Sequence, residues 1–393
     1  MARNIITGID IGTYYIKVVI ANAKERTERG FPKIVAVGVA ESRGMRHGYV
    51  TNMRDVATSI RKAVAQAEEK SGQKVRKAFI GVGGIGLNST IVNSFVMTSR
   101  ADAEITELDL TKLHEQCEKD MPISARANRR IIYDIPVQYK IDNFPSLGPP
   151  LGLTANKIEL KTLFITCLDH HVADLIASVN EAGIEVEDIM ASPVAASFVT
   201  LSKMQKIAGC VLANIGAETV SISVFENNIP ISLEVFPIGS TDITNDIALG
   251  LKVPLEEAEQ IKIGAITGSS YPRKKLEEII SARLSDIFEL IEAHLKKIGR
   301  NGLLPAGIVI TGGGSGLNSI DDLAKIALKL PSRIASLGII DGKSSFKDSP
   351  LSVAYGLCIW GIHAEETPEI DQTATYLKKV WKKAIRSVKQ LLP

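Results

Sequence analysis

The sequence predicts an α/β protein with two lobes, a small α+β domain inserted into the first lobe, and an amphipathic helix at the C-terminus. Strand-like and helix-like segments alternate along the chain, as they do in α/β folds. A strand, a glycine turn and a second strand occur twice, about 200 residues apart, which indicates an internal duplication. The pattern changes between residues 87 and 162, which indicates an insert between two parts of the first lobe.

Both β-hairpins are visible as apolar, β-branched runs on either side of a glycine turn. The first runs from residues 5–13 into 16–20, and the second from 211–216 into 219–224. Most hairpins of this kind bind nothing. Because two of them occur in one chain, the pair favours phosphate binding more strongly than either hairpin alone.

The first turn carries candidate binding residues for a phosphate and a metal. Gly12 allows the backbone to approach a phosphate, and successive amide N–H groups of the turn, with Thr13 and Tyr14, can form an anion-binding nest. Lys17 on the following strand adds a cation. Asp10 is placed to hold the water shell of Mg²⁺, which binds through few carboxylates and keeps its waters.

A third glycine cluster, Gly312, Gly313 and Gly314, follows the apolar strand at residues 307–311. Three glycines leave room for a flat group such as a nucleoside against bare backbone, whereas an ordinary loop needs only one glycine. The chain contains neither a GxxxxGK[ST] motif nor a GxGxxG motif that opens a helix. The sequence therefore favours neither a P-loop nor a dinucleotide-binding fold.

The remainder of the first lobe, residues 1–86 and 163–198, surrounds the insert. Residues 54–70 form an amphipathic helix by their apolar spacing. In the insert, residues 87–162, we predict a helix from about residue 110 to 119 and an alternating strand over residues 131–140.

The second lobe covers residues 199–350 and has a helical part at about residues 250–303. Residues 255–263 and 273–297 are helical by periodicity. The exposed side of the second helix is expected to present cations. They are Lys274, Lys275, Arg283, Lys296 and Lys297. A solvated helix face is the alternative interpretation of these charges.

The C-terminal part is expected to return to the first lobe at residues 351–363 and to continue as a linker over residues 364–374. The run at 351–362 is too short to span a membrane, so we interpret it as core. The linker contains Pro368 and several acids. Residues 375–393 then carry six basic side chains and no acidic one.

These last residues have the pattern of a helix that lies in the membrane interface. Six charges prevent it from crossing hydrocarbon. The predicted membrane-facing residues combine an apolar stripe with flanking cations. They are Leu377, Val380, Trp381, Ile385, Val388 and Leu391, with Lys378, Lys382 and Arg386. A helix docked on its own protein, or a calmodulin-type basic helix, remains an alternative.

Composition excludes several classes of protein. Without the six tail cations, 40 basic residues face 44 acidic ones, a formal charge of −4, so we expect no nucleic-acid partner. The four cysteines are scattered singly and no signal-peptide pattern opens the chain, which predicts a protein of the reducing cytoplasm.

The glycine motifs resemble those of the actin, Hsp70 and sugar-kinase superfamily, which implies a ribonuclease H-like, actin-like fold. Residues 8–13 with Lys17 resemble the first phosphate motif, and residues 214–219, with Asn214, Gly216 and Thr219, resemble the second. Residues 312–314 resemble the adenosine motif. Residues 259–262, with Glu259 and Lys262, resemble the helix that covers adenine and ribose.

Within the superfamily, the chain is similar to the FtsA family of bacterial division proteins. The stretches 42–48, 149–153, 164–167, 237–239 and 243–248 resemble that family's signatures. The resemblance implies ATP and Mg²⁺ as ligands, self-polymerisation, an SHS2-like insert, and peripheral attachment to anionic phospholipid at the inner face of the membrane, at the division site. It also implies that the helical part of the second lobe receives the C-terminal peptide of FtsZ, with Lys274 and Arg283 as candidate carboxylate partners.

The resemblance also bears on turnover. Asn214 stands where many relatives have an aspartate, and Ser192 stands where heat-shock relatives have a glutamate. Because both carboxylates are missing, we expect at most a weak ATPase, and we assign no catalytic residue. Asp169 and His170 are candidates for orienting water. A sugar or acid kinase of the same superfamily and a PilM-like pilus scaffold remain the alternative functions.

Overall fold

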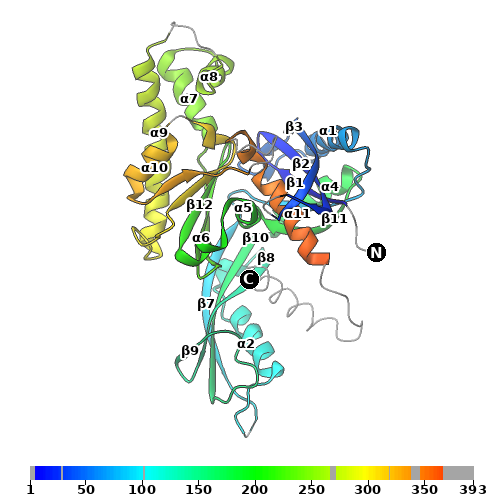
Figure 1. Ribbon diagram of the computed structural model, residues 1–393, viewed down its shortest axis with the longest axis vertical. Coiled ribbons are helices and arrows are strands. Elements are labelled where there is room, and N and C mark those ends of the chain that lie inside the picture. The colour runs from blue at the N-terminus through cyan, green and yellow to red at the C-terminus, as the bar shows by residue number, and fades with distance from the viewer. Residues whose placement is uncertain are drawn as a thin grey trace.

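The computed structural model describes residues 5–27, 30–100, 102–265, 271–317, 319–337 and 346–365. These residues form two five-stranded sheets, a four-stranded sheet and a short two-stranded hairpin (Figure 1), with three hydrophobic core clusters. The architecture confirms the prediction of a two-lobed α/β protein with an α+β insert. The helix predicted over residues 375–393 lies outside the described residues, as does nearly all of the predicted linker.

The first lobe is built on a sheet in the order β11-β6-β1-β2-β3, in which β1, β2 and β3 are antiparallel neighbours and β6 and β11 are parallel ones. The sheet consists of β1 (Ile5–Ile11), β2 (Tyr15–Arg26), β3 (Pro32–Glu41), β6 (Lys77–Val82) and β11 (Glu185–Ala191). The small hairpin β4 (Met45–Arg46) and β5 (Tyr49–Val50) follows β3. The helices are α1 (Met53–Ser71), α4 (Asp169–Glu181), α5 (Ser192–Thr200) and α11 (Ser352–Glu365).

The second lobe repeats the arrangement with the order β14-β13-β12-β15-β16, again three antiparallel strands followed by two parallel ones. Its strands are β12 (Cys210–Ile215), β13 (Val220–Glu226), β14 (Ile229–Phe236), β15 (Ile308–Thr311) and β16 (Ser332–Ile334). Its helices are α6 (Lys203–Ala208), α7 (Ser240–Leu251), α8 (Leu255–Lys262), α9 (Arg273–Lys297) and α10 (Ile320–Leu328), with the 3₁₀ turns η1 (Gly313–Gly316) and η2 (Phe346–Leu351). The matching strand orders confirm the duplication that the two hairpins predict.

The insert is an antiparallel sheet in the order β7-β10-β8-β9 that extends from the body at the bottom of Figure 1. Its elements are β7 (Asn88–Met97), α2 (Glu107–Lys119), α3 (Ile123–Arg126), β8 (Arg129–Ile141), β9 (Phe144–Ser146) and β10 (Lys157–Leu168). Helix α2 packs its buried Leu110 and Leu113 against this sheet. The insert also touches the second lobe, because the Ser89 hydroxyl accepts from Leu233 N and donates to Leu233 O, both at 2.8 Å.

Local capping decides where two of the helices begin. Asn52 accepts hydrogen bonds from the amides of Arg54 and Asp55, so α1 begins at Met53. It ends at Ser71, capped by Gly72 with a left-handed φ of 66°. Helix α2 begins at Glu107 and not at about residue 110, because Thr106 forms a capping box with Asp109. The predicted start was therefore wrong by one turn.

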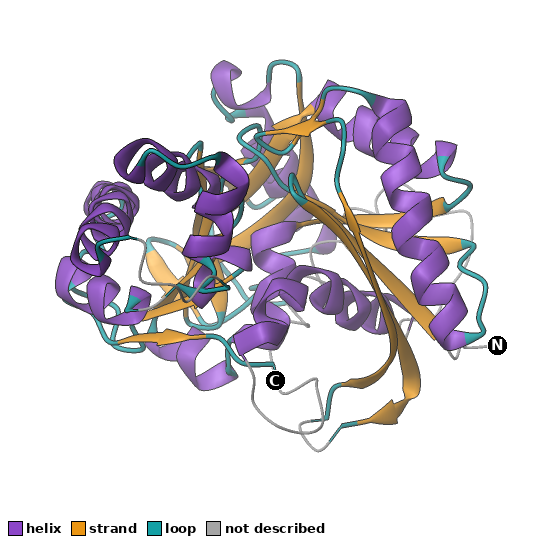
Figure 2. Ribbon diagram, turned by 90° about the horizontal axis from the view of Figure 1, so that it is seen from above, coloured by secondary structure: helices purple, strands orange, loops and turns teal. Residues whose placement is uncertain are grey.

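The two lobes meet through α5 and α11. Helix α5 contacts α11 and β11 on the side of the first lobe and β12 and β13 on the side of the second. A Cβ on Gly356 of α11 would lie 1.9 Å from the carbonyl oxygen of Ala195, so the two backbones touch at this glycine. Figure 2 shows the strands flanked by helices in this arrangement. Within the described residues, we find no helix with the length and hydropathy that a membrane span requires.

Candidate functional site

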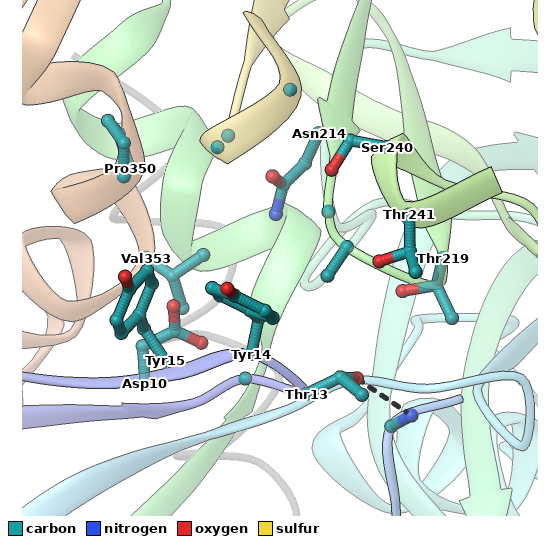
Figure 3. A pocket seen from close by; sticks show the side chains of 18 of the residues that line it. Asp10, Thr13, Tyr14, Tyr15, Asn214, Thr219, Ser240, Thr241, Pro350 and Val353 are labelled. Carbon is teal, nitrogen blue, oxygen red and sulfur yellow. Dashed lines mark hydrogen bonds between the residues drawn. The ribbon is translucent and has the colours of Figure 1, made fainter. Parts of the chain in front are cut away.

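A cavity of about 530 Å³ lies between the two lobes, within the size range of small-molecule sites. Residues of the β1–β2 turn, the β12–β13 turn and the start of α7 line it (Figure 3). The η1 turn and α8 complete the lining. All the cofactor-site residues that the sequence predicts lie on this one cavity. They are Asp10, Gly12, Thr13, Tyr14, Lys17, Asn214, Gly216, Thr219, Glu259, Lys262, Gly312, Gly313 and Gly314.

The first turn pairs its acid and its base across the hairpin. The register of β1 and β2 places Asp10 opposite Lys17, and Lys17 Nζ lies 3.0 Å from Asp10 Oδ2. Both side chains are mostly buried, with 14% and 16% of their surface exposed. A Cβ on Gly12 would lie 2.7 Å from the carbonyl oxygen of Tyr15, so a side chain there would displace the turn. The turn therefore presents bare backbone beside one ion pair.

The second turn is fixed by the first residues of α7. Its own closing bond runs from Gly216 N to Thr219 O at 2.8 Å. The amides of Ser240 and Thr241 donate to the carbonyl oxygens of Gly216 and Ala217 at 2.9 and 2.8 Å. The first amides of a helix lack partners inside the helix. Here they bond to the carbonyl oxygens of the turn, and these bonds hold the turn in place.

The glycine cluster after β15 reaches across to the end of β12. Gly312 has a left-handed φ of 95°, and a Cβ there would lie 2.3 Å from Asn214 Oδ1. A Cβ on Gly313 would meet no atom within 4 Å, and Gly313 lines the cavity. The wall at Gly313 is therefore open, so a planar group can lie against bare backbone there.

Helix α8 contributes a buried cation with a local hydrogen-bond network. Lys262 Nζ lies 2.7 Å from Glu259 Oε2 and donates to Thr244 Oγ1 at 2.8 Å and to Ser240 O at 3.1 Å. The Thr244 hydroxyl donates to Glu259 Oε2 at 2.6 Å. Only 7% of the Lys262 side chain is exposed. The network holds both charged groups against the cavity wall, where they can face hydroxyl groups of a ligand.

Tyr14 lies on the first-lobe side of the cavity, facing the residues of the second lobe (Figure 3). Burial, followed by the charges of Tyr15 and Glu259, raises the pKa of the Tyr14 phenol. Tyr14 is therefore a neutral hydrogen-bond donor at physiological pH, although 49% of its surface is exposed.

The charge of the cavity limits what it can bind. Its lining contains two carboxylates, Asp10 and Glu259, and two ammonium groups, Lys17 and Lys262, which cancel. A polyphosphate would thus depend on backbone amides and on a bound cation to offset its charge. Among the described residues no group of three or more His, Cys, Asp or Glu side chains could hold a metal. The lining residues fit Mg²⁺ of the kind that keeps its waters, with Asp10 and the Asn214 amide oxygen at hand.

Several residues that line the cavity were not predicted from the sequence. Gly48, Gly83 and Gly84 line the cavity from the first lobe, and Ser240 and Thr241 line it from the second. The pair at 83–84 directly follows β6, so it repeats the strand-then-glycine pattern that identified the other turns. The hydroxyl groups of Ser240 and Thr241 are harder to predict from the sequence, since only one glycine, Gly239, precedes them at the start of a helix.

The structure places the two candidates for water orientation outside the cavity lining. Asp169 lies 2.7 Å from Arg130 of the insert in an ion pair, and the His170 ring stacks on Tyr49 at 6.4 Å between centroids. Neither residue belongs to the lining of the cavity. Their side chains serve contacts between α4 and its neighbours, so the structure contradicts this assignment.

The candidate partner residues lie on α9, away from the cavity. Lys274 is exposed near the start of the helix. Arg283 is only half-exposed, because its guanidinium pairs with Asp246 of α7 at 2.7 Å and with Asp286 at 3.2 Å. The expectation that Arg283 is an exposed cation is therefore wrong.

Comparison with family models matches two parts of the chain. Residues 211–356 match the model described as "Cell division protein FtsA", and residues 86–166 match "SHS2 domain inserted in FTSA". The second match covers β7, α2, α3, β8, β9 and most of β10.

Curated relatives cover most of the chain. The cell division protein FtsA of Bacillus subtilis is 31% identical over 349 residues, which is 84% of this chain and 78% of the relative. FtsA of Pseudomonas aeruginosa is 29% identical over 382 residues, 92% of this chain and 90% of the relative.

Among solved structures, the PilM–PilN type IV pilus biogenesis complex has a chain with a TM-score of 0.66 at 17% identity, covering 91% of this chain and 98% of that one. MreB5 of Spiroplasma citri bound to AMPPNP has a TM-score of 0.52 at 12% identity, covering 93% of this chain and 98% of that one. At these identities the likeness shows the fold alone, and the fold is actin-like.

Proposed function

The chain belongs to the FtsA family of cell division proteins, and from this we propose that it is an ATP-binding, actin-like protein that polymerises at the inner face of the cell membrane and tethers FtsZ there. The observation that carries the nucleotide part is the convergence of three glycine turns from two lobes on one cavity. The membrane part rests on the cationic amphipathic sequence of residues 375–393.

In this proposal the exposed backbone of the glycine turns binds the nucleotide. Gly12, Thr13 and Gly216 receive the phosphates, while Gly313 lies under the base and the Glu259–Lys262 pair faces the ribose. Mg²⁺ held through Asp10 would gather phosphate oxygens and offset their charge. Since Asn214 and Ser192 offer no carboxylate, the chain has little with which to orient an attacking water. We propose slow or negligible turnover, with nucleotide acting mainly to close the cleft and favour polymerisation.

The cavity gives no support to a metabolic kinase. A sugar or acid kinase needs a carboxylate base between the lobes. The two carboxylates that line the described cavity, Asp10 and Glu259, are each paired with a lysine. The likeness to the pilus protein is one of fold, whereas the sequence relatives are division proteins.

Electron microscopy of the purified protein on anionic lipid, with and without ATP and Mg²⁺, tests the proposal as a whole. We expect filaments on the lipid surface in the presence of nucleotide, and recruitment of an FtsZ C-terminal peptide to them. Calorimetry that detects no ATP binding in the presence of Mg²⁺ would contradict the nucleotide assignment. Filaments that form equally well without lipid contact would contradict the membrane assignment.

A further inference from the structure

The tip of the β4–β5 hairpin bridges the two glycine turns that the cavity brings together. Gly48 N donates to Thr13 Oγ1 of the first turn at 3.2 Å, drawn as a dashed line in Figure 3. The neighbouring His47 N donates to the Glu218 carboxylate of the second turn at 2.5 Å, and His47 Nδ1 lies 3.3 Å from Glu218 O. One two-residue tip therefore connects both lobes beside the proposed phosphate position.

The tip has the backbone of a two-residue hairpin turn, with a positive φ at both central residues. His47 has a φ of 47°, in the left-handed region that residues other than glycine seldom occupy. Gly48 has a φ of 82°, and a Cβ there would lie 2.3 Å from Gly84 Cα in the loop after β6. The turn is therefore the one that favours a two-residue hairpin, and the close approach to Gly84 requires glycine at position 48.

The same hairpin contacts the base of the insert. His47 O accepts from Ile85 N at 3.4 Å, three residues before β7 begins at Asn88. The Tyr49 ring lies 4.8 Å from that of His171, whose Nε2 is 3.0 Å from Gly83 O. The segment 83–87 that joins β6 to β7 thus rests on the hairpin.

The first strand residue of β8 holds this segment from the insert's side. Arg129 Nη2 donates to Gly86 O at 2.5 Å, and Arg129 Nε donates to Thr166 Oγ1 of β10 at 2.9 Å. An unbroken set of contacts consequently runs from the two glycine turns through residues 47–49 and 83–86 to the strands of the insert. Networks of this kind can carry coupling when they contain an element with two arrangements.

We propose that the β4–β5 hairpin transmits the state of the cavity to the insert, and that the His47–Glu218 hydrogen bond is its latch. This inference rests on the proposed function, since the ligand that draws the turns together is the terminal phosphate of a nucleoside triphosphate. The latch already joins the tip to the second turn, so when the turns close on this group it carries the hairpin with them, and the hairpin presses residues 83–86 into one arrangement. By thermodynamic reciprocity, contacts that hold the insert in that arrangement raise the nucleotide affinity by the same factor.

Amide hydrogen exchange on the full chain tests the latch, first without nucleotide. Glu218→Ala removes the acceptor, whereas Glu218→Gln keeps one. His47→Gly serves as the matched control, because it removes the ring but retains the backbone N–H that forms the bond. Losing a hydrogen bond to a charged group should speed exchange of the residue-47 amide by at least about tenfold in Glu218→Ala. After correction for intrinsic rates, His47→Gly should keep slow exchange and Glu218→Gln should restore most of it.

The second arm adds ATP with Mg²⁺ at a concentration that calorimetry shows to be saturating for each protein. In the unaltered protein we expect added protection at residues 83–87 and at the start of β8, and AMP should not produce it. In Glu218→Ala this gain should disappear, while Glu218→Gln should retain it. A merely structural role of Glu218 would slow or speed exchange equally with and without nucleotide.

The outcomes separate the two proposals. If the unaltered protein binds ATP but shows no change at residues 83–87, or if Glu218→Ala shows the full change, the coupling is overturned and the nucleotide site stands. If residue 47 exchanges equally fast in all variants without nucleotide, the latch does not exist in solution. If calorimetry detects no ATP binding at all, the proposed function fails and the coupling falls with it.

Discussion

Arg283 and Asp246 form a bidentate ion pair that joins α9 to α7. Arg283 Nε donates to Asp246 Oδ2 at 2.7 Å and Nη2 donates to Oδ1 at 3.0 Å. Hydrogen bonding to Asp246 is the main cause that raises the pKa of Arg283 further above its ordinary value. Planar, doubly bonded pairs of this kind are more specific and stronger than single contacts. Arg283 therefore already has a carboxylate partner within its own chain.

The pairing changes how the proposed partner site on α9 should be tested. Lys274→Glu reverses an exposed charge and should weaken binding of an acidic FtsZ C-terminal peptide several-fold. It should leave the unfolding midpoint unchanged, since exposed substitutions usually change stability by less than about 0.5 kcal/mol. Arg283→Glu would place a third acid beside Asp246 and Asp286 and should lower the stability of the second lobe. Peptide titration and thermal unfolding of both variants measure the difference. Equal peptide affinity in Lys274→Glu and the unaltered protein would remove Lys274 from the site.

Two neighbouring glycines offer a matched test of the base site. Gly313→Leu should fold normally, because a Cβ there meets no atom within 4 Å. It should lower ATP affinity by about tenfold or more, because the side chain enters the cavity. Gly312→Leu should instead destabilise the protein, since its φ is 95° and its Cβ would collide with Asn214. Calorimetry with ATP and thermal unfolding distinguish the two effects. Unchanged ATP affinity in a folded Gly313→Leu variant would show that the base lies elsewhere.

The parts of the site that the sequence predicts are those fixed by local rules. The turns at Gly12 and Gly216 directly follow apolar strands, so their positions can be predicted from neighbours in the chain. Helix α9 forms over the predicted residues because its apolar spacing is regular over 25 residues. The start of α2 could also have been predicted, since Thr106 and Asp109 have the spacing of a capping box.

The remaining features depend on residues that are distant in the sequence. Arg283 looks like an exposed cation until the packing of α7 on α9 brings Asp246, 37 positions away, against it. His47 meets Glu218 across 171 positions and between two lobes. No periodicity or spacing in the chain encodes these distances. They result from the way the two sheets and the insert pack.

The residue at position 214 should control turnover. The unaltered protein should hydrolyse ATP far more slowly than a metabolic enzyme, and Asn214→Asp should be equal or faster because it supplies a carboxylate beside the phosphate turns. Single-turnover assays with Mg²⁺ measure both, and Asn214→Ala, which offers neither charge nor amide, is the control. A rate of about 10 s⁻¹ or more for the unaltered protein would be typical of an enzyme and would contradict the assignment as a scaffold.

Two buried histidines should make the protein less stable in mild acid. Burial lowers the pKa of His114 in the insert and of His294 in α9 to about 4, below the ordinary value of 6.5. Between pH 4 and pH 6.5 the unfolded chain binds more protons than the folded protein. The free energy of unfolding is therefore highest above pH 6.5 and decreases as the pH falls toward 4. Each histidine should cost on the order of 2 kcal/mol between pH 7 and 5.

Urea unfolding at pH 7 and pH 5 measures the loss, and His114→Gln should remove the share that comes from the insert. Each ring also has a carboxylate nearby, Asp134 at 3.8 Å from His114 and Glu234 at 3.6 Å from His294. If these acids outweighed burial, NMR titration would place the histidine pKa values above 6.5, and stability would rise as the pH falls from 7 to 5. Either result would contradict the prediction.

The C-terminal residues 375–393 lie outside the described structure, so the membrane prediction rests on their sequence. Each Lys or Arg near an anionic surface contributes about 1 kcal/mol, and burying a Leu, Ile or Val side chain contributes about 1.5–3 kcal/mol. Ordering the helix opposes both, at roughly 1–2 kcal/mol per residue. A single tail should therefore bind reversibly, while a filament with many tails binds tightly through effective concentration.

Trp381→Glu, at the centre of the apolar stripe, should consequently release the protein from anionic liposomes without loss of ATP binding, while the matched Trp381→Phe should stay bound. High salt should release the unaltered protein only in part, because screening weakens the charges and leaves the apolar contribution. Cosedimentation with liposomes and ATP calorimetry measure the two properties. If Trp381→Glu pellets as well as the unaltered protein, the stripe does not enter the membrane, and a helix docked on its own protein explains the pattern instead.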